Sequence, residues 1–205
     1  MPVQEGEYCG FETNIEDPGI LVVTFNRPES LNASTAAMKR DLVELLTQTQ
    51  MDDTIRIVVF TGRGQAFWAG DDLKGYGGDS VQVPQIHHGH HNPSGTYNGL
   101  RTISQAVNTA VRNLDKISIA AINGFAIQTG FSLALACDFR IASRSAKLGS
   151  ATLRFGLLPD EGGQWLLVQH LGVAKAMDFM MRKRIVDGET AFELGLVHEV
   201  VSDNN

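Results

Sequence analysis

Cysteine and positive charge are scarce in this sequence. Its 205 residues include only two cysteines, Cys9 and Cys137, far apart and without a partner pattern. Neither a disulfide framework nor a cysteine-based metal site is therefore indicated, and a reducing, cytoplasmic setting is expected. The formal net charge is −6. This balance argues against nucleic acid or an anionic membrane as a partner, because both require a basic field.

Long apolar runs are also missing. No uninterrupted apolar stretch approaches the roughly 20 residues of a membrane-spanning helix, and residues 1–20 lack the basic start and apolar core of a secretory signal. Hydrophobic residues nonetheless make up 43% of the chain. Because this content suffices for one sizeable core, we expect a soluble, single-domain protein over residues 1–205, with its core from about residue 15 to 201.

Short apolar runs alternate with segments of helical spacing. Residues 20–25 and 57–61 predict buried strands. Between them, Ser34 is a candidate N-cap for a helix whose apolar residues form one stripe (Met38, Leu42, Leu45 and Leu46). This order indicates a parallel βαβ unit and the α/β class. Further strands are expected at residues 117–123, 138–142, 146–149 and 196–201, and helices at residues 100–114, at 131–137 and beyond 162.

Neither periodicity is present from residue 62 to 99, which predicts a long loop whose mobile part covers residues 75–99. Loops of this length are usually functional or mobile. The loop contains four clustered histidines, His87, His88, His90 and His91. Imidazoles bind transition metals, but no carboxylate flanks these and no rigid element carries them. We therefore interpret the cluster as a solvated, pH-sensitive loop and predict no metal site.

Ser132 lies in a strand-turn-helix context that is also typical of a hydrolase nucleophile. Such a serine needs an acid and then a histidine later in the chain, within hydrogen-bond reach in the fold. Only His170 and His198 follow, one in a helical segment and one in the last predicted strand. We favour a local hydrogen-bonding role for Ser132 in the first turn of its helix.

Two turns carry a stronger signal, Gly70-Asp71 and Thr129-Gly130. Each follows a predicted buried strand and precedes a change of chain direction, so one backbone N–H from each turn can converge on a single point. The second turn starts a helix, where unsatisfied amides and the helix dipole favour negative charge. This is the geometry of an oxyanion hole.

The chain resembles the crotonase, or enoyl-CoA hydratase/isomerase, family from about residue 20 to 201. The resemblance is carried, in this order, by residues 25–33 (FNRPESLNA), 58–62 (VVFTG), 66–73 (AFWAGDDL), 120–124 (AAING) with Ala134, Cys137 and Asp138, and 155–159 (FGLLP) with Gly162 and Gly163. This series is more specific for the fold than for the reaction. It implies a spiral of ββα units, a homotrimer or hexamer, and acyl-CoA thioester substrates, with no cofactor besides the coenzyme A of the substrate.

The resemblance also implies roles for individual residues. The two oxyanion-hole amides would belong to Asp71 and Thr129, although the family usually has glycine at the second position. Contacts to adenine and pantetheine, mostly from the backbone, would fall on Ala33, Ala69, Asp72 and Leu73. Basic candidates for the phosphates, chosen by proximity in sequence, are Arg27, Lys39 and Lys74.

The acid-base residues depart from the hydratase pattern. The two hydratase glutamates fall on Ser132 and Thr152, and neither of these residues is a general base near pH 7. Glu161 matches the catalytic acid of peroxisomal-type enoyl-CoA isomerases, and Asp160 matches that of ring-oxepin isomerases. Acids are also favoured in the first turn of a helix for structural reasons. Both interpretations of the acidic pair remain open.

Three functions follow. The chain is expected to shift a double bond of an enoyl-CoA with Glu161 or Asp160 as the base. The first alternative is a hydratase whose water is held by other groups, such as Asp71 or the histidine loop. The second is a non-catalytic acyl-CoA binder that lacks the glutamate pair. Family members usually continue for several helices beyond the position of Asn205, so the C-terminal helical region is expected to be short or missing.

Overall fold

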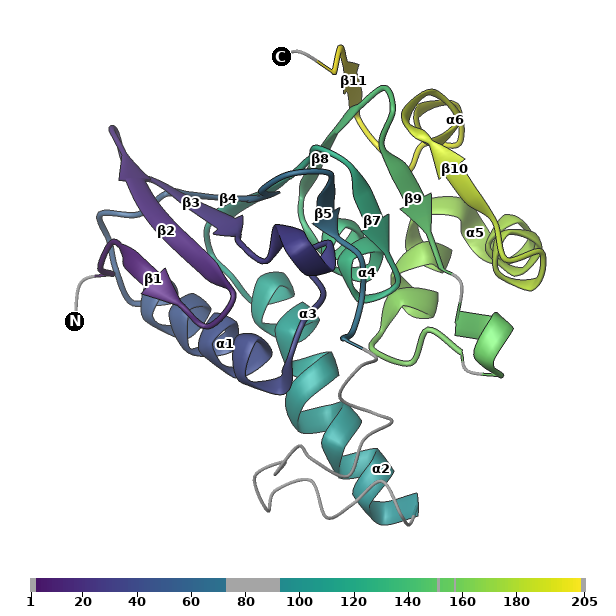
Figure 1. Ribbon diagram of the computed structural model, residues 1–205, viewed down its shortest axis with the longest axis horizontal. Helices are drawn as coiled ribbons and strands as arrows, with labels where there is room; N and C mark the ends of the chain where they lie inside the picture. Colours follow the sequence, from purple (N-terminus) through teal and green to yellow (C-terminus); the bar gives the residue numbers. More distant parts are fainter. Residues whose placement is uncertain (1–2, 73–92, 151, 157, 204–205) are drawn as a thin grey trace.

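Two β-sheets organise the chain, which a computed structural model describes for residues 3–72, 93–150, 152–156 and 158–203 (Figure 1). The seven-stranded sheet has the order β1-β2-β3-β4-β6-β8-β11. Its strands are β1 (Gly6–Tyr8), β2 (Phe11–Glu16), β3 (Ile20–Phe25), β4 (Ile57–Gly62), β6 (Ile117–Ile122), β8 (Phe139–Ser143) and β11 (Glu199–Val201). The four-stranded sheet has the order β10-β9-β7-β5. Its strands are β5 (Ala66–Trp68), β7 (Phe125–Ile127), β9 (Lys147–Gly149) and β10 (Ile185–Asp187).

One repeating step builds both sheets. The strands β4, β6 and β8 enter the large sheet, and the strand that follows each of them enters the small sheet. Neighbours from β3 to β11 run parallel, as do β5, β7 and β9. A helix comes after each pair, so the chain winds as the expected spiral of ββα units. The predicted βαβ unit is confirmed by the parallel register of β3 on β4, from Ile20 opposite Ile57 to Phe25 opposite Gly62.

The helices complete the spiral. They are α1 (Ala36–Gln50), α2 (Pro93–Gly99), α3 (Gln105–Arg112), α4 (Thr129–Ala136), α5 (Gly163–Met181) and α6 (Gly188–Glu193), with short helical turns η1 (Pro28–Ser30), η4 (Leu100–Ser104) and η5 (Thr152–Phe155). All eight residues of α4 are buried, and the helix contacts β5, β6, β7, α3 and α5. Gly130 is required there, because an added Cβ would lie 1.9 Å from the Trp68 carbonyl oxygen.

Three local expectations were wrong. Thr35, and not Ser34, caps α1, since its side chain accepts a hydrogen bond from the Met38 amide. The expected loop over residues 62–99 contains β5, whose three residues are too few to show a period. It also ends in α2. Pro93 suits a first helical turn because the missing N–H has no partner there. Of the predicted mobile part, residues 75–92 lie outside the described residues.

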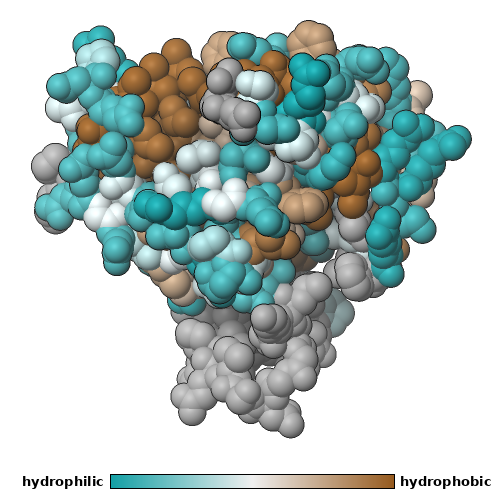
Figure 2. Space-filling model, turned by 45° about the horizontal axis from the view of Figure 1, so that its top comes forward, coloured by the Kyte–Doolittle hydropathy of each residue, from teal (hydrophilic) through white to brown (hydrophobic). Residues whose placement is uncertain are grey.

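Apolar side chains also reach the surface. Burial alternates along β6 and β8, so Ile117 and Phe139 point outward at 47% and 48% exposure. Figure 2 shows a large apolar patch at its upper left among hydrophilic residues. Within the described residues, no helix combines the length and apolar character needed to cross a bilayer.

Replacing Gly130 by alanine tests the packing of α4 on β5. Alanine favours an isolated helix by about 1 kcal/mol over glycine, whereas the backbone clash predicts a loss of at least about 3 kcal/mol in the free energy of unfolding. Urea denaturation measures the difference. Gly6→Ala is the control, because nothing lies within 4 Å of the Cβ that alanine would add there. A Gly130→Ala protein as stable as the wild type would contradict the close approach.

Candidate active site

The turns that follow β5 and β7 lie side by side. The two strands are parallel neighbours, so their carboxyl ends meet at one edge of the small sheet. An added Cβ on Gly70 would lie 3.4 Å from the Ile127 carbonyl oxygen. Beyond it, the Thr129 hydroxyl donates to Oδ1 of Asp71 at 3.1 Å. The residues predicted to carry the two amides therefore touch through their side chains.

The Asp71 amide is left free by the pairing of its neighbours. Ser34 forms a parallel bridge with Asp71, in which the Ser34 N–H donates to the Gly70 carbonyl and the Asp72 N–H donates to the Ser34 carbonyl, both at 2.9 Å. Successive N–H groups of an extended segment point to opposite sides. The Asp71 N–H consequently points away from Ser34, and it has no hydrogen-bond partner within the part of the chain described.

Thr129 opens α4 from a strained residue. Gln128 has φ 51° and ψ −110°, a conformation that side-chain-bearing residues seldom adopt. Its N–H donates to the Gly149 carbonyl, and its carbonyl accepts from Ser132 N–H. These bonds hold the turn, so the first-turn amide of Thr129 stays without an intrahelical partner. Strain of this kind persists where surrounding structure enforces it, often at functional sites.

Glu161 is the acid that the fold buries. Its side chain is 2% exposed, and Oε1 accepts a hydrogen bond from the Ser132 hydroxyl at 3.1 Å. Oε2 is buried without a partner among the described residues. Burial raises the pKa of Glu161 to about 7, and the negative charges of Asp160 and Asp71 act in the same direction, whereas the Ser132 hydrogen bond opposes them. The group can therefore gain or lose a proton near neutral pH.

Two side chains from the α3 region hold the turn that carries the acids. Asn108 donates from Nδ2 to the Glu161 carbonyl at 2.8 Å, and Gln105 donates from Nε2 to the Asp160 carbonyl at 2.9 Å. The Oδ1 atom of Asn108 is buried and, like Oε2 of Glu161, lacks a partner in the described segments. Asp160 itself is only half-buried.

The hydrogen bond of Ser132 was not predicted. The sequence favoured a local bond, but the hydroxyl reaches a carboxylate 29 positions later. Neither candidate histidine serves it. Nε2 of His170 lies 3.0 Å from the Leu135 carbonyl, and Nδ1 of His198 accepts from the Arg140 N–H. Thr152, which the resemblance aligns with the second hydratase glutamate, is buried, and its hydroxyl lies 2.9 Å from that of Ser150.

Lys39 is wrongly predicted as a phosphate ligand. It is 4% exposed, and Nζ pairs with Oδ1 of Asp71 at 2.7 Å and donates to the Ser104 hydroxyl at 3.1 Å. A buried, paired ammonium does not face solvent. The sequence held a signal for this burial, because Lys39 falls on the same apolar stripe of α1 as Met38 and Leu42.

The remaining residues predicted to contact coenzyme A lie together where they are described. The Arg27 guanidinium pairs with Asp72 at 3.0 Å and also donates to the Ala33 carbonyl. The Ala69 N–H donates to the carbonyl of Leu31, two residues before Ala33, at 3.1 Å. Leu73, Lys74 and the four histidines lie outside the described residues. Their roles, and those of Arg27, Ala33, Ala69 and Asp72 in coenzyme A binding, stay predictions.

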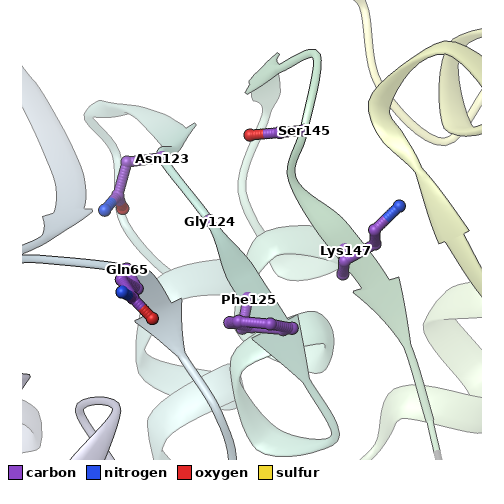
Figure 3. Close-up of a pocket in the computed structure, with 6 residues that line it drawn as sticks. All are labelled: Gln65, Asn123, Gly124, Phe125, Ser145 and Lys147. Atoms are coloured by element: carbon purple, nitrogen blue, oxygen red, sulfur yellow. The ribbon is translucent and has the colours of Figure 1, made fainter. Parts of the chain in front are cut away.

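A separate cavity of about 240 Å³ lies at the other edge of the small sheet (Figure 3). It is lined by Gln65, Asn123, Gly124, Phe125, Ser145 and Lys147. These residues precede or begin β5, β7 and β9, whereas Asp71 and Thr129 follow the carboxyl ends of β5 and β7. Ligands of parallel sheets usually bind at the carboxyl ends, so we place the candidate site there. No cluster of three or more metal-ligating side chains occurs among the described residues.

Curated proteins of the enoyl-CoA hydratase and acyl-CoA isomerase kinds are similar to this chain over most of its length. The chain is 38% identical to the 1,2-epoxyphenylacetyl-CoA isomerase of Escherichia coli over 191 residues, which cover 91% of this chain and 68% of that protein. It is 36% identical to a probable peroxisomal enoyl-CoA hydratase 1 of Arabidopsis thaliana, covering 92% of this chain and 65% of the relative. The chain thus spans about two thirds of these relatives' length.

Solved structures show the same architecture. An enoyl-CoA hydratase from Bacillus anthracis superposes with a TM-score of 0.84 at 31% identity, covering 96% of this chain and 71% of that one. A monofunctional enoyl CoA isomerase from M. smegmatis gives 0.74 at 32% identity, covering 95% and 78%. The family model described as enoyl-CoA hydratase/isomerase matches residues 16–205. The chain therefore belongs to the enoyl-CoA hydratase/isomerase family.

Proposed function

We propose that this chain is an acyl-CoA enzyme that shifts a double bond of an enoyl thioester, with Glu161 as the proton carrier. The observation that carries this proposal is the burial of Glu161 against Ser132. Ser132 lies in the first turn of α4, the helix that begins at Thr129 and whose first amide would bind the thioester oxygen. One carboxylate oxygen accepts from the serine hydroxyl, and the other, buried and without a partner among the described residues, is the atom that would take the proton from a substrate carbon. Asp160 is the weaker candidate because it is only half-buried.

The reaction needs one base and one anion site. The thioester oxygen accepts hydrogen bonds from the amides of Asp71 and Thr129, which makes the α-proton of a 3-enoyl thioester more acidic. Ionised Glu161 removes that proton, and the electron pair delocalises over a dienolate whose charge rests on the thioester oxygen. Protonated Glu161 then returns the proton to the γ-carbon, giving the 2-enoyl thioester. A pKa near 7 suits a group that both removes and returns a proton.

The names of the relatives are divided between isomerases and hydratases. One match is called a 1,2-epoxyphenylacetyl-CoA isomerase and another a monofunctional enoyl CoA isomerase, whereas a third is called a probable enoyl-CoA hydratase. Because the chain spans only about two thirds of its curated relatives, its activity, its substrate and any trimer or hexamer remain proposals.

Hydration is a second candidate, favoured by one observation. Oδ1 of Asn108 and Oε2 of Glu161 are both buried acceptors without described partners. A water that donates to both would satisfy them, since buried polar atoms are normally hydrogen-bonded. Activated by Glu161, such a water could add to the β-carbon of a 2-enoyl thioester. The hypothesis of non-catalytic acyl-CoA binding is tested by the same assay.

Glu161→Gln should abolish turnover while preserving the fold. The amide oxygen still accepts from Ser132 but carries no proton between carbons, so kcat should fall by about 10²–10⁴-fold. Mixing the protein with 3-enoyl-CoA and following the conjugated 2-enoyl thioester absorbance measures isomerisation. A decrease in the absorbance of added 2-enoyl-CoA measures hydration instead.

Asp160→Asn is the matched control for that substitution and should retain activity. If Asp160→Asn is inactive and Glu161→Gln is active, the assignment of the base is reversed. If the wild type binds acyl-CoA but turns over neither thioester, the chain is a non-catalytic binder.

The pH profile reports the state of Glu161. A base must be ionised, so kcat/KM should fall as pH drops below about 7. The Ser132 hydroxyl stabilises the ionised form, and its removal in Ser132→Ala should raise the pKa of Glu161 and shift the acidic limb to higher pH. Initial rates from pH 5 to pH 9, about two units on either side of neutrality, measure the acidic limb of the wild type and of Ser132→Ala. An identical limb in Ser132→Ala would contradict the role of this hydrogen bond.

A further inference from the structure

One carboxylate oxygen ties together three elements around the two free amides. Oδ1 of Asp71 accepts from the Ser34 hydroxyl at 3.0 Å, pairs with Nζ of Lys39 at 2.7 Å, and accepts from the Thr129 hydroxyl at 3.1 Å. These donors come from the segment before α1, from α1 itself and from the start of α4. The atom therefore joins segments that are far apart in the sequence.

The three residues that donate to Oδ1 of Asp71 are buried. Ser34, Lys39 and Thr129 are 4%, 4% and 1% exposed. A buried ammonium is unfavourable unless it is paired and hydrogen-bonded. Lys39 meets both requirements through Asp71 and Ser104. The pair is consequently a fixed part of the fold, unlike exposed ion pairs whose geometry fluctuates.

Two residues of this contact, Asp71 and Thr129, carry the amides of the proposed anion site. A hydrogen bond from Thr129 Oγ1 to Asp71 Oδ1 restrains the distance between the two backbone N–H groups, because each side chain is covalently attached to its amide. We propose that Lys39, through Asp71, and the Thr129 hydroxyl are positioning groups that hold the two oxyanion-hole amides in register. This inference rests on the proposed function.

Lys39 has a second effect on the same site. Asp71 has a carboxylate side chain, and its backbone amide would bind the enolate oxygen. If that carboxylate were unpaired, its negative charge would oppose the negative charge that develops on the enolate oxygen. The Lys39 ammonium at 2.7 Å neutralises the carboxylate. Removing Lys39 alone should therefore weaken enolate binding more than removing Lys39 and the Asp71 charge together.

Binding of a stable enolate tests the positioning role without requiring turnover. Acetoacetyl-CoA is the probe, since an oxyanion hole favours its enolate, which has its own near-ultraviolet absorption band. Butyryl-CoA cannot form such an enolate near neutral pH and measures ground-state binding. Thr129→Val removes the hydroxyl at nearly constant volume, and Thr129→Ser restores it. Thr47→Val is the control, because Thr47 is an exposed threonine of α1 whose hydroxyl bonds only to its own helix.

Thr129→Val should weaken enolate binding by about 10- to 100-fold, the scale of an ångström-sized displacement at a reactive centre. Its affinity for butyryl-CoA should change by less than about threefold, since binding of this ground-state ligand does not depend on the exact spacing of the two amides. Thr129→Ser should recover most of the lost enolate affinity, and Thr47→Val should match the wild type. Equal enolate binding by wild type and Thr129→Val overturns the positioning role, as does an equal loss for both probes.

Lys39→Met and the pair Lys39→Met with Asp71→Asn test the charge. Lys39→Met should weaken enolate binding at least as much as Thr129→Val does, and the double variant should bind the enolate more tightly than Lys39→Met. If Lys39→Met does not fold, the threonine series decides. A wild-type protein that shows no enolate band overturns the proposed function and this inference together. A wild-type band with unaffected variants overturns the inference alone.

Discussion

The close packing of α4 against β5 is the constraint on which the rest of the structure depends. Gly130 sits so near the Trp68 carbonyl that no side chain fits, and this approach places the start of α4 beside the turn after β5. Next to this contact, Gln128 adopts a strained conformation that is held by hydrogen bonds of its N–H and its carbonyl. Two turns that are remote in the sequence thereby lie at one edge of the small sheet, and the amides of Asp71 and Thr129 lack hydrogen-bond partners among the described residues.

The acid reaches this edge from another part of the chain. Ser132 falls, by the family resemblance, on a hydratase glutamate position, and Glu161 approaches its small side chain from the turn before α5. An added Cβ on Gly163 would lie 2.1 Å from the Ser132 hydroxyl oxygen, so this approach also depends on glycine. Burial raises the pKa of the acid to about 7, and Oε2 of Glu161 has no hydrogen-bond partner among the described residues. Among the described residues, Glu161 is therefore the buried carboxylate at this edge.

Both residues that carry the proposed oxyanion-hole amides, Asp71 and Thr129, have polar side chains. Asp71 and Thr129 bond to each other, and Lys39 compensates the charge that Asp71 introduces. The arrangement combines a buried ion pair, whose desolvation is unfavourable, with an anion site that requires a fixed geometry. Its energetic cost has a functional explanation if the pair holds the amides in place. Stability alone does not explain it, because apolar residues would fill the same volume with less desolvation.

The sequence by itself determined the α/β class, the parallel βαβ unit, the order of family segments and the two turns that flank the site. These follow from local periodicity, from turn chemistry and from short motifs, which are all encoded by neighbouring residues. Only the tertiary structure decided which of Asp160 and Glu161 is buried, that Ser132 bonds to a distant carboxylate, and that Lys39 pairs with Asp71. These facts depend on contacts between remote segments, because burial and hydrogen-bond partners are set by packing and not by local spacing.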